Sequence, residues 1–179
     1  TLEIEPRETV TQTLITDLLD SRLDAAIVAL PISEPALQEF ALFEEDFILV
    51  RPKSEADRPI PPPTSLREKR LLLLEAGHCF RDQALSFCEM PKSNPRYLME
   101  GSSLSTLVQM VGAGMGLTLI PEMAVTLETR TAEVSIARFA PPSPRRTIGM
   151  VWRRSNPLAG QLMQVAAALR QVGKPPGGG

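Results

Sequence analysis

The sequence predicts an α/β fold, because short apolar runs typical of buried strands alternate with segments that suit helices. The clearest strand is Leu71–Leu74, an uninterrupted apolar run bounded by polar residues. The clearest helix follows Ser102 or Ser103, either of which can cap its first turn. The glycine-rich segment 112–116 ends that helix, and residues 117–121 form the next strand. This order of elements favours largely parallel sheets.

The other expected elements continue the same alternation. Strands are expected over residues 2–5, 23–30, 40–50, 96–100 and 147–152, and helices over residues 8–19, 81–87 and from 156 onward. Many of the 17 prolines cluster in the connections between these elements. The end of the chain, residues 173–179, is rich in proline and glycine and is expected to be a disordered tail.

Composition excludes several classes of protein. The chain has 179 residues, of which 43% are hydrophobic, so it is long enough for one domain or two small lobes. Its net charge of −2 leaves no basic surface that would favour DNA binding by this segment alone. No apolar run approaches the roughly 18 residues of a membrane span, and no secretory signal is recognised. Because two cysteines do not make a secreted disulfide scaffold, we expect a cytoplasmic protein without membrane contact.

The two cysteines lie in the segment GHCFRDQALSFC, residues 77–88, which carries the most specific chemistry of the chain. Cys79 follows the Leu71–Leu74 strand and a short turn, so it is expected at or next to the N-terminus of a helix. There the free backbone N–H groups and the helix dipole stabilise a thiolate, and Arg81 and His78 can add to this effect. Cys79 is therefore a candidate for oxidation.

The spacing of Cys79 and Cys88 indicates how the pair could react. In one straight helix, nine residue steps place the two Cα atoms about 13–14 Å apart along the axis and on opposite faces. A disulfide tolerates Cα separations of only up to roughly 7 Å, so the two cysteines could be joined only if the segment unwinds. Two buried, inert cysteines are the alternative that the spacing leaves open. A metal site is not expected, because these cysteines and the single histidine do not make four ligands at zinc spacing.

Three blocks of sequence resemble the effector-binding region of LysR-type bacterial transcription regulators. They are, in order, SRLDAAIVAL, ALFEEDFILV and LSTLVQMVGAGMGLTLIP. Within that family, GHCFRDQALSFC and the later segment PRRTIGMVWR look like the peroxide sensors of the OxyR group. The resemblance runs from about residue 2 to about residue 169. Its cysteine block is specific, whereas the glycine-rich block identifies only the wider family.

This resemblance implies a fold of two Rossmann-like α/β lobes that resemble type II periplasmic binding proteins and are joined by two crossover segments. Lobe I would comprise residues 1–44 and 147–172, and lobe II would comprise residues 45–146 with both cysteines. In the family, a DNA-binding helix-turn-helix, a linker helix and one more strand and helix precede the segment equivalent to Leu2. The chain therefore looks like a regulatory domain that lacks its first elements and its DNA-binding part.

The resemblance also implies roles for individual residues. Cys79 would match the peroxidatic cysteine and Cys88 the resolving cysteine, which together form a switching disulfide. A second group would line the peroxide pocket or activate the thiolate. Its members are Thr11, in the turn after the first expected strand, with His78, Asp82 and Arg146, and Arg81 joins them through its expected effect on the thiolate at the helix N-terminus.

The implied function is that of a hydrogen-peroxide-sensing regulatory domain, not an enzyme, with no cofactor. Its implied partners are hydrogen peroxide, further copies of the chain in a dimer or tetramer, a cellular thiol reductant, RNA polymerase, and DNA through the absent N-terminal domain. One alternative is a LysR-type domain that binds a small organic effector, which titration with metabolites and with peroxide would separate from a sensor. The other is a thiol peroxidase-like enzyme, which rapid multiple turnover with a reductant would reveal.

Overall fold

A computed structural model describes residues 3–90 and 98–172 of the chain. The chain divides into two compact units, one formed by Thr1–Phe43 with Thr147–Gly179 and the other by Glu44–Arg146. The expected tail over residues 173–179 lies outside the described residues, as does part of the strand expected over residues 96–100.

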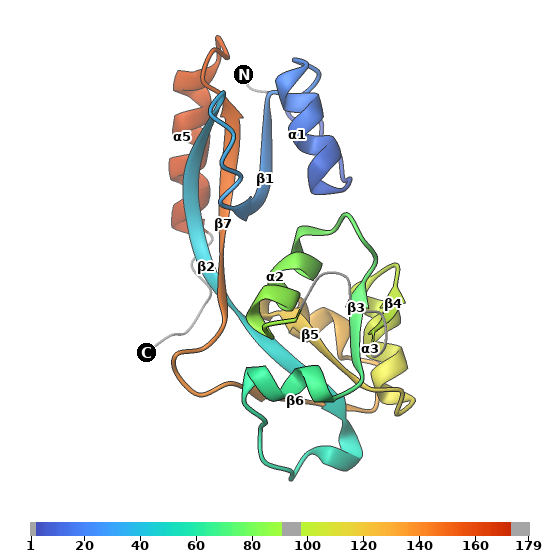
Figure 1. The fold of residues 1–179 in the computed structure, drawn as a ribbon. Helices are drawn as coiled ribbons and strands as arrows, with labels where there is room; N and C mark the ends of the chain where they lie inside the picture. The colour runs from blue at the N-terminus through green and yellow to red at the C-terminus, as the bar shows by residue number, and fades with distance from the viewer. Residues whose placement is uncertain (1–2, 91–97, 173–179) are drawn as a thin grey trace. The chain divides into compact units, whose positions relative to one another are not determined.

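Strands and helices alternate along most of the chain, so the predicted α/β class is confirmed (Figure 1). The first unit contains α1 (Thr11–Leu19), β1 (Ala25–Leu30), the beginning of β2 (Leu37–Pro52), most of β7 (Arg145–Arg153) and α5 (Ala159–Val172). The second unit contains the rest of β2, η1 (Lys53–Glu55), η2 (Pro63–Glu68), β3 (Leu71–Leu74), α2 (Cys79–Phe87), β4 (Leu98–Gly101), α3 (Leu104–Gly112), β5 (Leu117–Pro121), η4 (Glu122–Ala124), α4 (Val125–Glu128) and β6 (Val134–Arg138).

The strands follow the hydrogen-bonded order β1-β7-β2-β5-β3-β4, and β6 pairs with β2. Strands β2 and β7 each have residues in both units and are the two crossover segments. In the first unit, β1 runs antiparallel to β7, with Ala25 opposite Trp152 and Leu30 opposite Thr147. In the second unit, β3 lies between β4 and β5 and is parallel to both.

The expectation of largely parallel sheets is wrong. Strand β2 pairs antiparallel with both β5 and β6, and β1 pairs antiparallel with β7. Strand β3 pairs in parallel with β4 and with β5, and these three strands are joined through helices α2 and α3. A helical crossover returns the chain in the same direction, whereas strands without such a helix between them are free to pair antiparallel.

The start of the chain also differs from expectation. Residues 3–5 are exposed and form no strand, and Ile4 has 73% of its surface exposed. An extended segment becomes a strand only through hydrogen bonds to a neighbour, which alternation of side chains cannot supply. Helix α1 begins at Thr11 with Val10 as its N-cap, three residues later than the expected start at residue 8.

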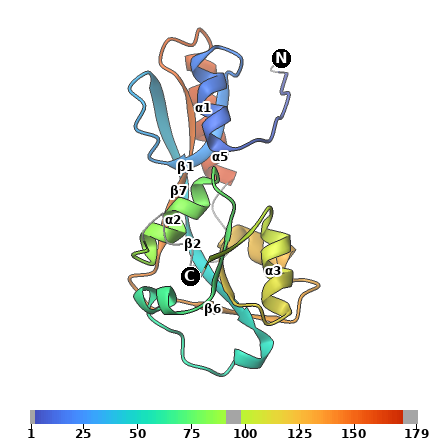
Figure 2. The same ribbon diagram turned by 45° about the vertical axis from the view of Figure 1, so that its right-hand side comes forward.

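The core of the second unit surrounds β3, whose four leucines are all buried. Helices α2 and α3 both contact this strand, and they are seen on either side of the strands of this unit in Figure 2. Helix α3 is capped as predicted, because the Ser103 hydroxyl accepts a hydrogen bond from the Thr106 N–H at 3.1 Å. The predicted strand 117–121 is also confirmed as β5.

Candidate functional site

The helix that carries the cysteines begins where the sequence predicts. Gly77 takes a φ of +101°, which lets the chain turn sharply after β3, and His78 follows as the N-cap with an extended backbone. Cys79 is the first residue of α2 and is half-buried. The His78 side chain makes no capping hydrogen bond. Cys79 therefore lies at the positive end of the dipole of α2.

Cys88 lies at the other end of α2, in a different environment. It is the C-cap residue, it is fully buried, and its N–H donates to the Ala84 carbonyl at 3.0 Å. Burial raises the pKa of the Cys88 thiol to about 12. At neutral pH this thiol is therefore protonated and a poor nucleophile for as long as the helix stays folded.

Helix α2 keeps the two thiols apart, as the spacing predicts. Both Cys79 and Cys88 are free cysteines, and the segment between them is helical throughout. Nine steps along such a helix correspond to about 13 Å, beyond the reach of a disulfide. Glu89, the residue after Cys88, takes a left-handed φ of +52° that turns the chain out of the helix.

Arg81 connects α2 to the strands behind it. Its side chain is buried, and its Nη1 donates to the Leu74 carbonyl at the end of β3 at 2.8 Å and to Glu100 on β4. This guanidinium therefore ties the first turn of α2 to two parallel strands. Asp82 is exposed in the same turn, where the positive N-terminal end of the helix dipole stabilises a carboxylate. The expected roles of both residues toward the thiolate stay predictions.

Arg146 approaches the same turn of the helix from β7. Its guanidinium carbon lies 5.1 Å from the centroid of the Phe80 ring, and Phe80 follows Cys79 directly. The guanidinium is also paired with Glu45 on β2, with Nε 2.7 Å from Oε1. The structure thus brings Arg146 against α2, although 67 residues of sequence separate it from Cys79.

Thr11 belongs to the other unit, where it is the first residue of α1 and half-buried. It lies inside the helix rather than in a turn before it. The remaining predicted site residues all belong to the second unit. A role for Thr11 in a peroxide pocket stays a prediction.

Comparison with known proteins identifies the family. The model of the LysR substrate binding domain matches residues 1–174. The chain belongs to the LysR family.

Relatives in this family include known regulators. A "probable hydrogen peroxide-inducible genes activator" of Streptomyces viridosporus is 40% identical over 175 residues, which cover 96% of this chain and 56% of that protein. The DNA-binding transcriptional dual regulator OxyR of Escherichia coli is 38% identical, with 94% of this chain and 56% of that protein covered. The chain spans about half the length of the curated relatives it matches.

Solved structures of LysR-family regulators share the fold. The reduced form of the OxyR regulatory domain from Pseudomonas aeruginosa is 33% identical with a TM-score of 0.76, over 90% of this chain and 80% of that one. A Corynebacterium glutamicum OxyR C206 mutant is 33% identical with a TM-score of 0.80, over 91% of this chain and 52% of that one. The predicted fold, resembling type II periplasmic binding proteins, is therefore confirmed, and the homologues are transcription regulators.

The sequence analysis did not identify two acidic residues that pair with the arginines near the first turn of α2. Glu45 and Glu100 hold the guanidinium groups of Arg146 and Arg81, respectively. Sequence reasoning could have found Glu45 only as one of three consecutive acidic residues, Glu44, Glu45 and Asp46, and nothing in that run marks which carboxylate is buried. Its partner could not be found in the same way, since the pair spans 101 residues of sequence.

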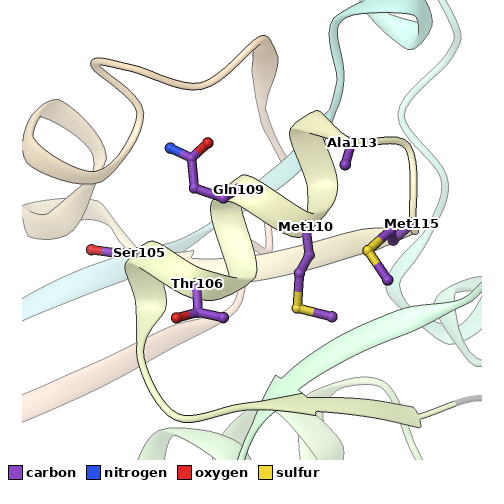
Figure 3. A pocket seen from close by; sticks show the side chains of 6 residues that line it. All are labelled: Ser105, Thr106, Gln109, Met110, Ala113 and Met115. Carbon is purple, nitrogen blue, oxygen red and sulfur yellow. The ribbon is translucent and has the colours of Figure 1, made fainter.

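A hollow elsewhere in the second unit lies over α3 (Figure 3). The residues that line it are Ser105, Thr106, Gln109, Met110, Ala113 and Met115. Neither cysteine is among them, so this hollow is separate from the thiol site. Within residues 3–90 and 98–172, no group of three or more His, Cys, Asp or Glu side chains could hold a metal ion. No described helix is both long and apolar enough to cross a membrane.

Proposed function

We propose that this chain is the hydrogen-peroxide-sensing regulatory domain of an OxyR-like regulator, switched by a Cys79–Cys88 disulfide. The observation that supports the proposal most strongly is the unequal placement of two free thiols on one helix. Cys79 is half-buried at the N-terminal end, whereas Cys88 is fully buried at the C-terminal end. The Cys79 thiol can therefore react with an oxidant, whereas the Cys88 thiol becomes accessible only when the helix opens.

The first chemical step takes place at Cys79. Its thiolate sulfur attacks one oxygen of hydrogen peroxide, a sulfur–oxygen bond forms, and the oxygen–oxygen bond breaks. The second oxygen leaves as hydroxide and takes up a proton to become water. Cys79 is then a sulfenic acid, oxidised by two electrons, and one molecule of peroxide has been reduced.

The second step requires Cys88 to reach the oxidised sulfur. The Cys88 sulfur, once deprotonated, attacks the sulfur of the Cys79 sulfenic acid, a disulfide forms, and the sulfur–oxygen bond breaks. The departing hydroxide takes the proton lost by Cys88 and leaves as a second water. Because α2 separates the two sulfurs and its packing holds Cys88 protonated, this step proceeds only through an unwound α2.

The energies of the two forms are of comparable size, which suits a reversible switch. Unwinding α2 exposes the buried side chains of Phe80 and Leu85 unless they repack, at about 1.5–3 kcal/mol each. A disulfide that closes so short a loop offsets roughly 3 kcal/mol. The oxidised form is therefore open to reduction by a cellular thiol, which would reset the sensor.

The remaining site residues have supporting roles in this proposal. His78 and Arg81 flank Cys79 in the sequence, and Asp82 lies in the same turn of α2. Arg146 supplies a cation beside this turn. The N–H groups of His78, Arg81 and Arg146 are the donors that would favour the thiolate and the oxygen that leaves.

The partners follow from the same proposal. The domain acts as a homo-oligomer, and unwinding of α2 changes the arrangement of its subunits. DNA binding falls to the part of the relatives that this chain does not cover, in keeping with its net charge of −2. RNA polymerase is a further candidate partner. The location we propose is the cytoplasm.

The test combines chemical mapping with hydrogen exchange. One equivalent of peroxide should convert the two free thiols into a Cys79–Cys88 disulfide, seen by peptide mapping, and exchange across residues 79–88 should rise. Cys88→Ser should stop at an oxidised Cys79, and Cys79→Ser should be nearly inert. A disulfide that forms without any change in exchange would contradict the unwinding, and a Cys79 that stays reduced at micromolar peroxide would contradict the sensor.

A further inference from the structure

The carboxylate of Glu45 is buried, although the acidic residues on either side of it are not. Its side chain has 4% of its surface exposed, whereas the side chains of its neighbours Glu44 and Asp46 have 61% and 25% exposed. A buried carboxylate is stable only when hydrogen bonds and an opposite charge replace the water it has lost. The partners of Glu45 therefore show what this residue holds in place.

Both carboxylate oxygens of Glu45 are engaged. Oε1 accepts from Arg146, with Nε at 2.7 Å and Nη2 at 2.5 Å. Oε2 accepts from the backbone N–H of Met123 at 3.2 Å. The backbone bond fixes the orientation of the carboxylate, and the carboxylate in turn fixes the guanidinium, because a planar guanidinium pairs with an acid in few geometries.

The guanidinium held in this way contacts the helix that bears Cys79. Arg146 has 11% of its side-chain surface exposed and lies over the ring of Phe80, which is itself buried. The Phe80 ring also meets Phe47 edge-on at 5.0 Å, so it cannot move away to follow the guanidinium. The position of Arg146 relative to the first turn of α2 therefore depends on Glu45.

The geometry points to Glu45 as a positioning residue that holds Arg146 against the first turn of α2 and so sets the rate at which Cys79 reacts with peroxide. This inference rests on the proposed function. Without the carboxylate, the buried guanidinium loses its counter-ion and turns toward water, where it no longer supplies a fixed positive charge beside the first turn of α2. Glu45 need not touch the peroxide, since it acts through Arg146.

The experiment measures two rates of Cys79 in the Cys88→Ser background of the full chain. The first is the rate constant of oxidation by hydrogen peroxide, followed by quenched flow and mass spectrometry. The second is the rate constant of alkylation by iodoacetamide, measured well above the pH of roughly 8.5 at which a free thiol titrates, so that the thiol is fully ionised and the rate reports only its exposure. Glu45→Gln is expected to slow oxidation roughly 10- to 100-fold and to leave alkylation unchanged.

Two further variants test whether Glu45 acts by positioning Arg146 or by a general loosening of the structure around Cys79. Glu44→Gln removes the same charge one residue away, from an exposed carboxylate paired with Arg145 at 3.4 Å, and should change neither rate. Glu45→Gln should add nothing in an Arg146→Gln background, because the residue that it positions is already gone. Equal changes in both rates, or an additive effect in that background, would overturn the inference.

A third variant covers the case in which Glu45→Gln does not fold. Glu45→Asp keeps the charge but shortens the side chain by one methylene, and it should slow oxidation by about tenfold. A folded Glu45→Asp or Glu45→Gln protein with an unchanged oxidation rate would refute the positioning role alone. If the parent Cys88→Ser protein itself fails to react with micromolar peroxide, the proposed function fails instead, so the two failures are distinguishable.

Discussion

The ring of Phe80 on α2 meets the ring of Phe47 on β2 edge-on, with the centroids 5.0 Å apart and the planes at 73°. Phe87, near the other end of α2, contacts the same Phe47 ring at 6.2 Å and also contacts Phe139 at 5.5 Å. Both ends of the helix are therefore packed against one crossover strand. Unwinding of α2 would break both contacts with Phe47 and so change the packing of β2, the crossover strand that carries this residue.

Phe47→Leu should speed formation of the disulfide once Cys79 has been oxidised. The substitution removes two edge-to-face contacts, each worth about 0.5–1.5 kcal/mol, from the folded helix only. The free energy needed to open α2 falls accordingly, and a fall of about 1.4 kcal/mol corresponds to tenfold faster opening. Phe40→Leu is the matched control, because Phe40 belongs to the first unit and packs against Arg170. Quenched-flow mapping that shows no faster disulfide step would contradict this prediction.

Glu89→Gly should slow formation of the Cys79–Cys88 disulfide. Glu89 has a φ of +52°, a conformation that costs a non-glycine residue about 1 kcal/mol and that glycine adopts freely. Relieving this strain stabilises the end of α2 that buries Cys88, so the disulfide should form more slowly. Hydrogen exchange across α2 is the measurement, and faster exchange in the glycine variant would count against the idea. Glu68→Gly, in the short helix η2, controls for the loss of a surface charge.

Raising the pH should loosen the end of α2 that holds Cys88. Burial raises the pKa of this thiol to about 12, whereas an unfolded cysteine titrates near 8.5. Between these values only the opened form loses the proton, so stability is fully present below about pH 8.5 and falls by up to about 1.4 kcal/mol per pH unit above it. Alkylation of Cys88 in Cys79→Ser should therefore rise steeply with pH. In Cys88→Ala, opening of α2 should lose this pH dependence.

Arg81→Ala should destabilise the second unit by roughly 3 kcal/mol. The buried guanidinium satisfies the Leu74 carbonyl and pairs with Glu100, and its loss leaves that carbonyl without this donor. Arg58→Ala, which removes an exposed pair with Glu55, should change stability by less than about 1 kcal/mol. Urea unfolding followed by circular dichroism measures both. Equal effects of the two substitutions would show that the buried contacts of Arg81 contribute nothing to stability.

The sequence by itself determined the local elements around the thiols. The apolar run of β3, the helix that begins at Cys79, the Ser103 cap and the β5 strand were all predictable, because each depends on residues a few positions apart. The separation of Cys79 from Cys88 followed from helix geometry alone.

Only the tertiary structure decided which distant residues meet. It paired Glu45 with Arg146 and Arg81 with Glu100, made β2 antiparallel to β5 and β6, and left residues 3–5 without a strand. It also added β6, which short-range patterns did not reveal. Strand partners and buried ion pairs depend on which segments the collapsed chain brings together, and periodicity along the sequence carries no record of that choice. The thiol helix was therefore predictable, whereas the contacts that hold it closed were not.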